Sequence, residues 1–150
     1  MREILFRGKN KQGEWVYGNY CEAEYLEGDG IEHLIIEIPR NGCSVHIIPE
    51  TVGQYTGLKA NGKKIFEGDI LQVITGSGWT CPKGTKVYYE VVFTEFNPEN
   101  ASWSEYIGYM AKMESGALRS LDSVIRRYGA VVVGNIHDNP ELLKGESENA

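Results

Sequence analysis

The sequence predicts a mainly β fold: a small barrel with SH3-like elements, additional hairpins and one or two short helices. The 150 residues include 18 glycines and 9 tyrosines. Glycine supplies turns and tyrosine favours strands, so this composition indicates many short strands. Apolar and β-branched runs recur at intervals of roughly 8 to 15 residues, a spacing typical of barrels and sandwiches. The pattern does not alternate strands with long helices, which argues against a parallel sheet.

Length and composition indicate one domain. The chain is 41% hydrophobic and 24% charged, as in ordinary globular proteins. A chain of this length buries roughly two thirds of its unfolded surface, enough for one core. We expect a single β-rich domain over residues 1–143 and a polar, disordered tail over residues 144–150.

Four strands are expected in the first third of the chain. Ile4–Arg7 and Glu14–Tyr20 flank a polar turn over residues 8–13, which indicates a hairpin. Two further strands follow turns that contain glycine: Glu32–Ile38 and Cys43–Ile48.

The remaining strands are expected at Glu50–Tyr55, Ile70–Thr75, Lys86–Phe93, Trp103–Met113 and Ala130–Ile136. Two short helical segments are also expected. Apolar residues spaced i, i+3, i+4 and i+7 predict a helix over Leu121–Tyr128, with Gly129 as its C-cap. Pro140 suits the first position of a last helical turn.

The segment Gln54–Leu71 contains the densest turn signals. Asn61-Gly62 tolerates positive φ at both central positions of a turn. Ile65 and Phe66 supply one apolar side chain to each face of a strand. Gly68 permits a sharp bend, and Asp69 can accept hydrogen bonds from nearby backbone N–H groups. A turn, an apolar pair and Gly-Asp before a strand are typical of SH3-like barrels.

This segment and the C-terminal run together resemble the YopX-like family of phage and prophage proteins. The opening Met1–Arg7 is also similar to the usual start of that family. The motif residues are Gln54, Tyr55, Thr56, Gly57, Leu58, Gly62, Ile65, Phe66, Glu67, Gly68, Asp69, Gly134, Asn135, Ile136, Asn139 and Pro140. The resemblance spans Met1–Leu143, and Gly76–Arg127 contains no motif that matches.

The resemblance implies a mainly β domain that contains a barrel and forms a homo-oligomer. It also implies a protein encoded by temperate phages or prophages of Gram-positive hosts. No enzymatic activity is attached to the family, so the resemblance transfers no catalytic residues.

Charge and targeting signals indicate the setting. The formal net charge is −6 and the pI about 5.1, which disfavours non-specific binding to nucleic acid and to anionic membranes. Residues 1–11 lack a signal-peptide core, and no apolar run is long enough to span a membrane. Cys21, Cys43 and Cys81 are too few and too dispersed for a disulfide framework. We therefore expect a host-cytoplasmic protein with reduced thiols.

Candidate catalytic and metal-binding groups have simpler structural interpretations. His33, His46 and His137 do not follow a metal-ligand spacing. Cys81 lies in a Gly/Pro loop, and no base is identified near it. Glu67 and Asp69 could share a strand face, but acidic residues at a turn more commonly accept backbone hydrogen bonds. We expect Asn135 and Asp138 to order the turn before Pro140. We expect no catalytic site, metal or cofactor.

Binding is the remaining function class. Trp79, Lys83, Lys86 and Trp103 are the hypothetical binding surface, because exposed aromatic and basic residues can contact a partner. Basic residues also cluster loosely at Lys59, Lys63 and Lys64 and at Arg119, Arg126 and Arg127. We expect function on the loops Gly76–Gly84 and Asn97–Met113. The sequence therefore predicts a protein that binds a host or phage protein. The alternative is a nucleic-acid-binding barrel, and the third and least favoured class is a hydrolase that uses Glu67, Asp69 or a histidine.

Overall fold

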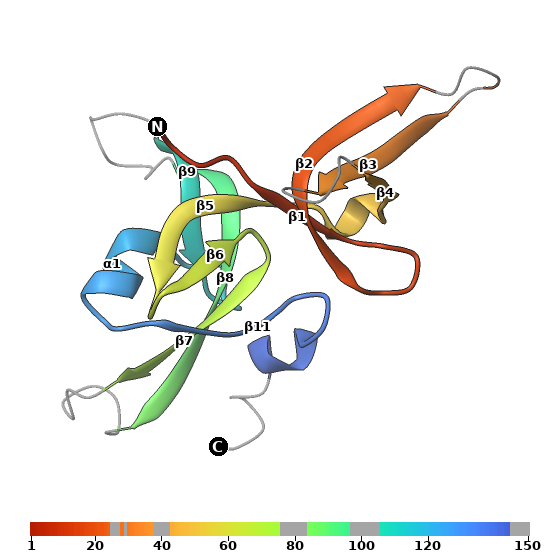
Figure 1. The fold of residues 1–150 in the computed structure, drawn as a ribbon. Coiled ribbons are helices and arrows are strands. Elements are labelled where there is room, and N and C mark those ends of the chain that lie inside the picture. The colour runs from red at the N-terminus through yellow and green to blue at the C-terminus, as the bar shows by residue number, and fades with distance from the viewer. Residues whose placement is uncertain (25–27, 29, 38–42, 76–83, 97–105, 145–150) are drawn as a thin grey trace. The chain divides into compact units, whose positions relative to one another are not determined.

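The computed structural model describes residues 1–24, 28, 30–37, 43–75, 84–96 and 106–144 (Figure 1). The chain forms two compact units, Met1–Gly57 and Leu58–Ala150. We refer to them as the N-terminal and C-terminal units. The expectation of one domain over residues 1–143 stays a prediction.

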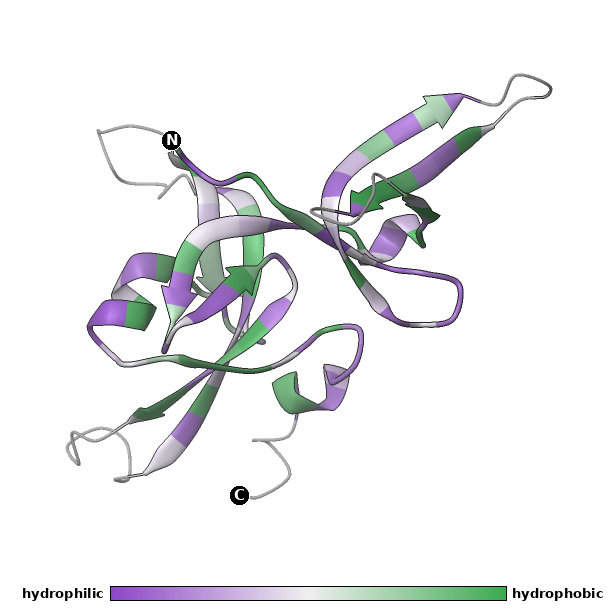
Figure 2. Ribbon diagram, in the orientation of Figure 1, coloured by the Kyte–Doolittle hydropathy of each residue, from purple (hydrophilic) through white to green (hydrophobic). Residues whose placement is uncertain are grey.

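The N-terminal unit is built from antiparallel strands in the order β4-β3-β2-β1-β5. Its elements are β1 (Phe6–Lys9), β2 (Trp15–Glu24), β3 (Ile31–Glu37), β4 (Ser44–His46), the 3-10 turn η1 (Pro49–Thr51) and the start of β5 (Gly53–Ala60). Figure 2 shows both hydrophobic and hydrophilic residues along β2 and β3. Val16 of β2, Ile35 of β3 and Ile47, just after β4, form one buried cluster.

Two close contacts hold this unit together. A Cβ atom on Gly18 would lie 2.0 Å from the carbonyl oxygen of Ile36, so only glycine allows β2 and β3 to approach so closely. The Thr51 hydroxyl accepts a hydrogen bond from the Lys9 N–H (2.8 Å) and donates one to the Ile48 carbonyl (2.6 Å). These bonds join η1 to β1.

The C-terminal unit contains a second antiparallel sheet in the order β10-β9-β8-β7-β11. The end of β5 continues into this unit and pairs with β6. The elements are β6 (Lys63–Phe66), β7 (Asp69–Thr75), β8 (Thr85–Phe96), β9 (Tyr106–Lys112), β10 (Leu118–Ser120), α1 (Leu121–Arg126), β11 (Val131–Asn135) and the 3-10 turn η2 (Pro140–Leu143).

The core of this unit lies between the sheet, the β5–β6 hairpin and α1. Ile65 from β6, Leu71 from β7, Val91 from β8 and Val124 from α1 belong to one buried cluster. Ile65 and Phe66 are both buried, so β6 is covered on both faces. Gly129 adopts a φ of 65° after the helix, and its N–H donates to the Ile125 carbonyl (3.1 Å). The C-cap residue itself is Arg127, in the right-handed helical region, so the expected C-cap Gly129 lies two residues beyond it.

The mainly β class with few helices is confirmed. The expected small barrel is not: the described strands form two antiparallel sheets, and neither closes on itself. Closure requires the two edge strands of a sheet to pair with each other. Turn residues such as Gly68-Asp69 set local corners and do not determine that long-range pairing.

Most element boundaries shift by a few residues from their predicted positions. The strand expected at Glu50–Tyr55 begins only at Gly53, because Pro49–Thr51 form η1. The strand expected to end at Phe93 continues to Phe96. The helix ends at Arg126 rather than Tyr128. The last helical turn begins at Pro140 as expected and is a 3-10 turn.

Asp69 provides a test of the corner between β6 and β7. Its side chain is buried, and its carboxylate accepts a hydrogen bond from the Phe66 N–H (2.8 Å). Asp69→Asn weakens a buried charge-assisted bond, so we expect the free energy of unfolding to fall by roughly 1.5–3 kcal/mol. Urea unfolding measures this change. The control Asp122→Asn alters an exposed carboxylate and should cost less than about 1 kcal/mol; equal losses would contradict a special role for Asp69.

Candidate interaction surface

The two motif regions lie at one corner of the C-terminal unit. Gly68, with a φ of 85°, donates its N–H to the Val91 carbonyl (2.9 Å) and accepts from the Ile136 N–H (2.8 Å). β11 pairs with β7 and ends at Asn135. Asn135 holds the turn that follows, because its Oδ1 accepts hydrogen bonds from the N–H groups of His137 (3.0 Å) and Asp138 (2.9 Å). Both regions therefore order backbone at this corner.

The other motif residues also lie in turns and strands. Asn61 and Gly62 have φ values of 50° and 78°, as the turn chemistry predicts. A Cβ atom on Gly134 would lie 2.4 Å from Asn139 Oδ1, so any other residue here would displace the Asn139 side chain. Gln54, Tyr55, Thr56, Gly57 and Leu58 lie in β5, and Pro140 begins η2.

A free strand edge is the first candidate for binding. β8 pairs with β7 only from Thr85 to Glu90, whereas it pairs with β9 from Glu90 to Phe96. Among the described strands, residues 92–96 therefore have a neighbour on one side only, and we name them the β8 edge. The Val91 carbonyl accepts from Gly68 on the β7 side. Because backbone groups alternate along a strand, those of Phe93 and Glu95 point to this open side.

These outward backbone groups are available for pairing. Within the described part of the chain, the Phe93 N–H and carbonyl and the Glu95 N–H have no hydrogen-bond partner on the open side. The Glu95 carbonyl is 3.4 Å from the Thr94 hydroxyl, a weak contact. The edge thus presents the donors and acceptors that an added strand requires.

Apolar side chains flank the β8 edge. Phe93 is 56% exposed and Ile107 58% exposed, although both are large hydrophobic residues. Phe93 pairs with Tyr109, and Glu95 pairs with Ile107, so the four side chains share one face. The Phe93 and Tyr109 rings lie 5.1 Å apart in an edge-on arrangement. This face continues the buried core face past the point where the core ends.

A groove near the start of β8 is the second candidate. It has a volume of about 390 Å³ and is lined by Thr85, Lys86, Val87, Tyr88, Met113, Glu114, Ser115 and Leu143. Lys86 of the hypothetical binding surface therefore lines a groove. The other three residues of that surface, Trp79, Lys83 and Trp103, fall outside the described residues, as does Cys81.

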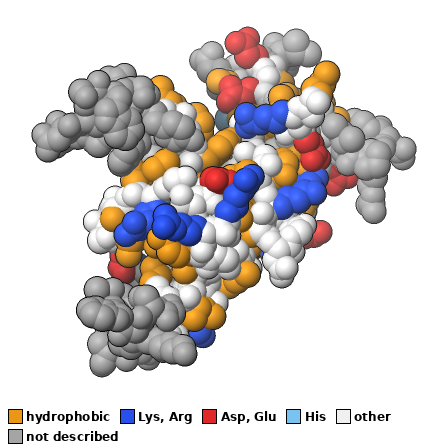
Figure 3. Space-filling view, turned by 90° about the vertical axis from the view of Figure 1, so that its left-hand side faces the viewer, with side chains coloured by type: hydrophobic (Ala, Val, Ile, Leu, Met, Phe, Trp, Pro, Cys, Tyr) orange, Lys and Arg blue, Asp and Glu red, His pale blue; other side chains and the backbone are white. Residues whose placement is uncertain are grey.

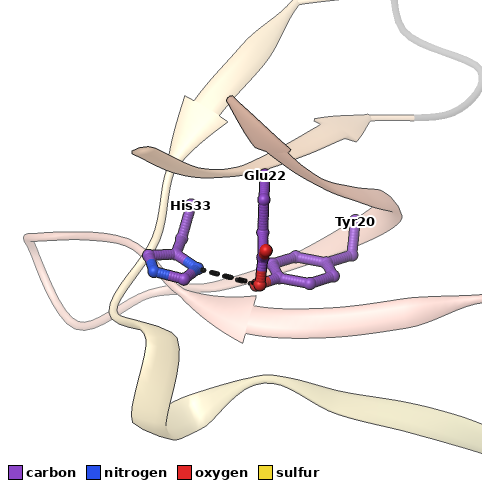
Figure 4. A network of polar contacts seen from close by, with 3 residues as sticks. All are labelled: Tyr20, Glu22 and His33. Atoms are coloured by element: carbon purple, nitrogen blue, oxygen red, sulfur yellow. Dashed lines mark hydrogen bonds and ion pairs between the residues drawn. The ribbon is translucent and has the colours of Figure 1, made fainter. Parts of the chain in front are cut away.

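A polar cluster on β2 and β3 is the third candidate (Figure 4). The Tyr20 hydroxyl donates to Glu22 Oε1 (2.8 Å) and lies 2.7 Å from His33 Nδ1. The Tyr20 and His33 rings stack with centroids 6.1 Å apart. Burial, followed by the hydrogen bond to Glu22 and its charge, raises the pKa of Tyr20 to about 12. The phenol is thereby held in its protonated form.

The remaining titratable candidates are dispersed. His46 is exposed on β4, and His137 is half-buried beyond β11. Cys21 is half-buried on β2, and Cys43 is exposed. Over the described ranges, no three or more His, Cys, Asp or Glu side chains are grouped to hold a metal ion.

The sequence interpretation did not single out Phe93, Ile107 or Tyr109. The available signal is that strand-favouring residues continue past Phe93, at Thr94 and Phe96. They extend β8 beyond its pairing with β7, and a strand that outlasts its neighbour leaves an edge.

Comparisons with known proteins identify one family and one solved structure. A family model described as "YopX protein" matches residues 5–144. The crystal structure of protein EF1440 from Enterococcus faecalis is similar, with 25% sequence identity and a TM-score of 0.52. The similarity covers 95% of this chain and 99% of that protein. No curated protein matches. In the helices that the structure describes, none is long and apolar enough to cross a membrane.

The raised pKa of Tyr20 predicts a pH-dependent contribution to stability. The folded pKa of about 12 lies above the usual tyrosine pKa of 10.0, so the folded state retains its proton to higher pH. This contribution is complete below about pH 10 and is lost as the pH rises towards 12. Between about pH 9 and pH 11, the wild-type protein should lose more free energy of unfolding than Tyr20→Phe does. Urea unfolding at both pH values measures the difference, and identical losses would contradict it.

Proposed function

This chain belongs to the YopX family, and we propose that it is a non-enzymatic binding protein that acts through protein–protein contact. In this proposal it is encoded by a phage or prophage, acts in the host cytoplasm and forms a homo-oligomer. The observation that carries the proposal is the β8 edge with its exposed Phe93 and Ile107.

The edge is suited to strand addition. Pairing an extended segment with Phe93 and Glu95 satisfies their backbone groups through main-chain hydrogen bonds. Covering a side chain such as Phe93 removes apolar surface from water, and full burial of such a side chain contributes about 1.5–3 kcal/mol. An exposed edge beside apolar side chains is a feature that monomeric proteins usually avoid.

A second copy of the chain is the occupant that we propose for the homo-oligomer. The two residues whose backbone groups point outward, Phe93 and Glu95, lie on either side of Thr94 in the chain. An antiparallel pair with its two-fold axis at Thr94 places Phe93 opposite the partner's Glu95. Because like residues do not face each other in this register, the two Glu95 carboxylates avoid direct apposition. The same surface patch serves both subunits, as a closed dimer requires.

Placement of the carboxylates supports binding rather than hydrolysis. A hydrolytic pair needs carboxyl groups that face a shared substrate position. Asp69 is 2% exposed and bonded to the backbone of Phe66. Asp138 accepts from the Asn135 side-chain amide at 3.0 Å. Both carboxylates have structural partners at the corner of the C-terminal unit.

Two variants test the edge in solution. Phe93→Lys places a charge on the edge, and Glu95→Pro removes an outward N–H that has no partner within the described residues. We expect the wild-type protein to sediment as a dimer or larger assembly and both variants to sediment as monomers. Analytical ultracentrifugation measures this change.

Ile4→Lys is the matched control, because Ile4 is 61% exposed and lies outside the strands. This variant should keep the wild-type assembly. A wild-type monomer at concentrations up to roughly 10⁻⁴ M, where weak protein interfaces already form, would overturn the homo-oligomer proposal. Unchanged assembly of Phe93→Lys and Glu95→Pro would overturn the assignment to the β8 edge.

A further inference from the structure

A basic surface on the C-terminal unit lies apart from the residues of the β8 edge. We infer that this surface binds single-stranded nucleic acid, with lysine and arginine side chains on the phosphates and the Tyr128 ring on a base. We name it the basic face. Its residues are Lys59, Lys63, Lys64, Arg119, Arg126, Arg127 and Tyr128.

The fold brings these residues to one region from two parts of the sequence. Ala60 and Ile65 of the β5–β6 hairpin share a buried cluster with Leu121 and Val124 of α1. The hairpin and the helix therefore pack around the same core, and their basic side chains lie on the outer side. Figure 3 shows the side of the molecule that carries α1, with Lys and Arg side chains spread among apolar ones.

The charge of the basic face opposes that of the whole chain. Residues 58–64 and 118–128 contain six Lys and Arg and one Asp, a formal charge of +5. Since the whole chain has a formal charge of −6, the remaining residues carry −11. Such segregation concentrates positive potential on one region. An acidic pI therefore does not exclude local attraction of a polyanion.

Four of the cations have no ion-pair partner in the described part of the chain: Lys59, Lys63, Arg119 and Arg127. All four are exposed. Arg126 is the exception, because its Nε lies 2.7 Å from Asp122 Oδ1. Unpaired surface cations attract counterions, and binding to a phosphate backbone releases the counterions condensed on the nucleic acid.

Tyr128 favours a single strand over other polyanions. It is 49% exposed and directly follows Arg127 at the end of α1. An aromatic ring beside cationic side chains stacks on an unpaired base while the cations contact phosphates. In a duplex the bases are already stacked and the ring has no base face to contact. An acidic peptide or an anionic membrane would use the cations and leave the ring without a specific role.

Fluorescence anisotropy with a labelled 20-nucleotide oligo(dT) tests the inference. If four cations each neutralise one phosphate, a rise in salt from 50 to 200 mM should weaken binding roughly 50-fold, because the slope is about 0.7 per phosphate for single strands. The double variant Lys63→Glu/Arg127→Glu should lose binding. Arg2→Glu/Lys11→Glu is the matched control, since both double variants change the formal charge from −6 to −10. The control should bind better than the double variant at every salt concentration.

Tyr128 variants separate stacking from charge. Tyr128→Ala should weaken binding roughly 5- to 100-fold without changing the salt dependence, and Tyr128→Phe should restore it. Circular dichroism checks that each variant is folded. Equal losses in the two charge-reversal variants, equal affinity for poly-glutamate or tighter binding to a duplex would each overturn the inference. None of these variants alters the β8 edge, so this test and the sedimentation test can fail independently.

Discussion

Gly68 occupies the position on which the C-terminal unit depends. Its N–H bonds to the Val91 carbonyl of β8, and its carbonyl accepts from Ile136, just after β11. The neighbouring Asp69 bonds back to Phe66 at the end of β6. Four strands are thus tied by one bend with a φ of 85°, a conformation that side chains other than glycine rarely adopt. Gly68, the buried Asp69 carboxylate and the Asn135 turn together order the backbone at this corner.

The same bend determines where the sheet stops. Gly68 makes the last described hydrogen bond on that side of β8, and the residues before it, up to Phe66, form β6 of the other sheet. β8 nevertheless continues to Phe96 with β9 as its partner. The corner that closes one side of the core thereby leaves the next backbone groups of β8 without a described strand beside them. The β8 edge is a consequence of the corner rather than a separate feature.

Local chemistry could be predicted from the sequence, and long-range pairing could not. Asn61-Gly62, Asp69 and the Leu121–Val124 spacing depend on residues within one turn or helix, and the structure places them as predicted. The absence of closure into a barrel and the free side of β8 depend on which distant strands pair. The register of such pairs is a property of the whole sheet. The strand expected over Lys86–Phe93 for this reason gave no indication that Phe93 would be 56% exposed.

The two proposed surfaces would reinforce each other. A homodimer formed through the β8 edge carries two basic faces, so a single strand long enough to reach both would bind twice. The second contact is then intramolecular and benefits from an effective concentration that the first contact sets. This increases affinity for long strands without new residues, whereas a short oligonucleotide gains nothing. Because each chain carries a net charge of −6, a homodimer repels phosphates at long range more than one chain does, so its advantage comes only from the second contact.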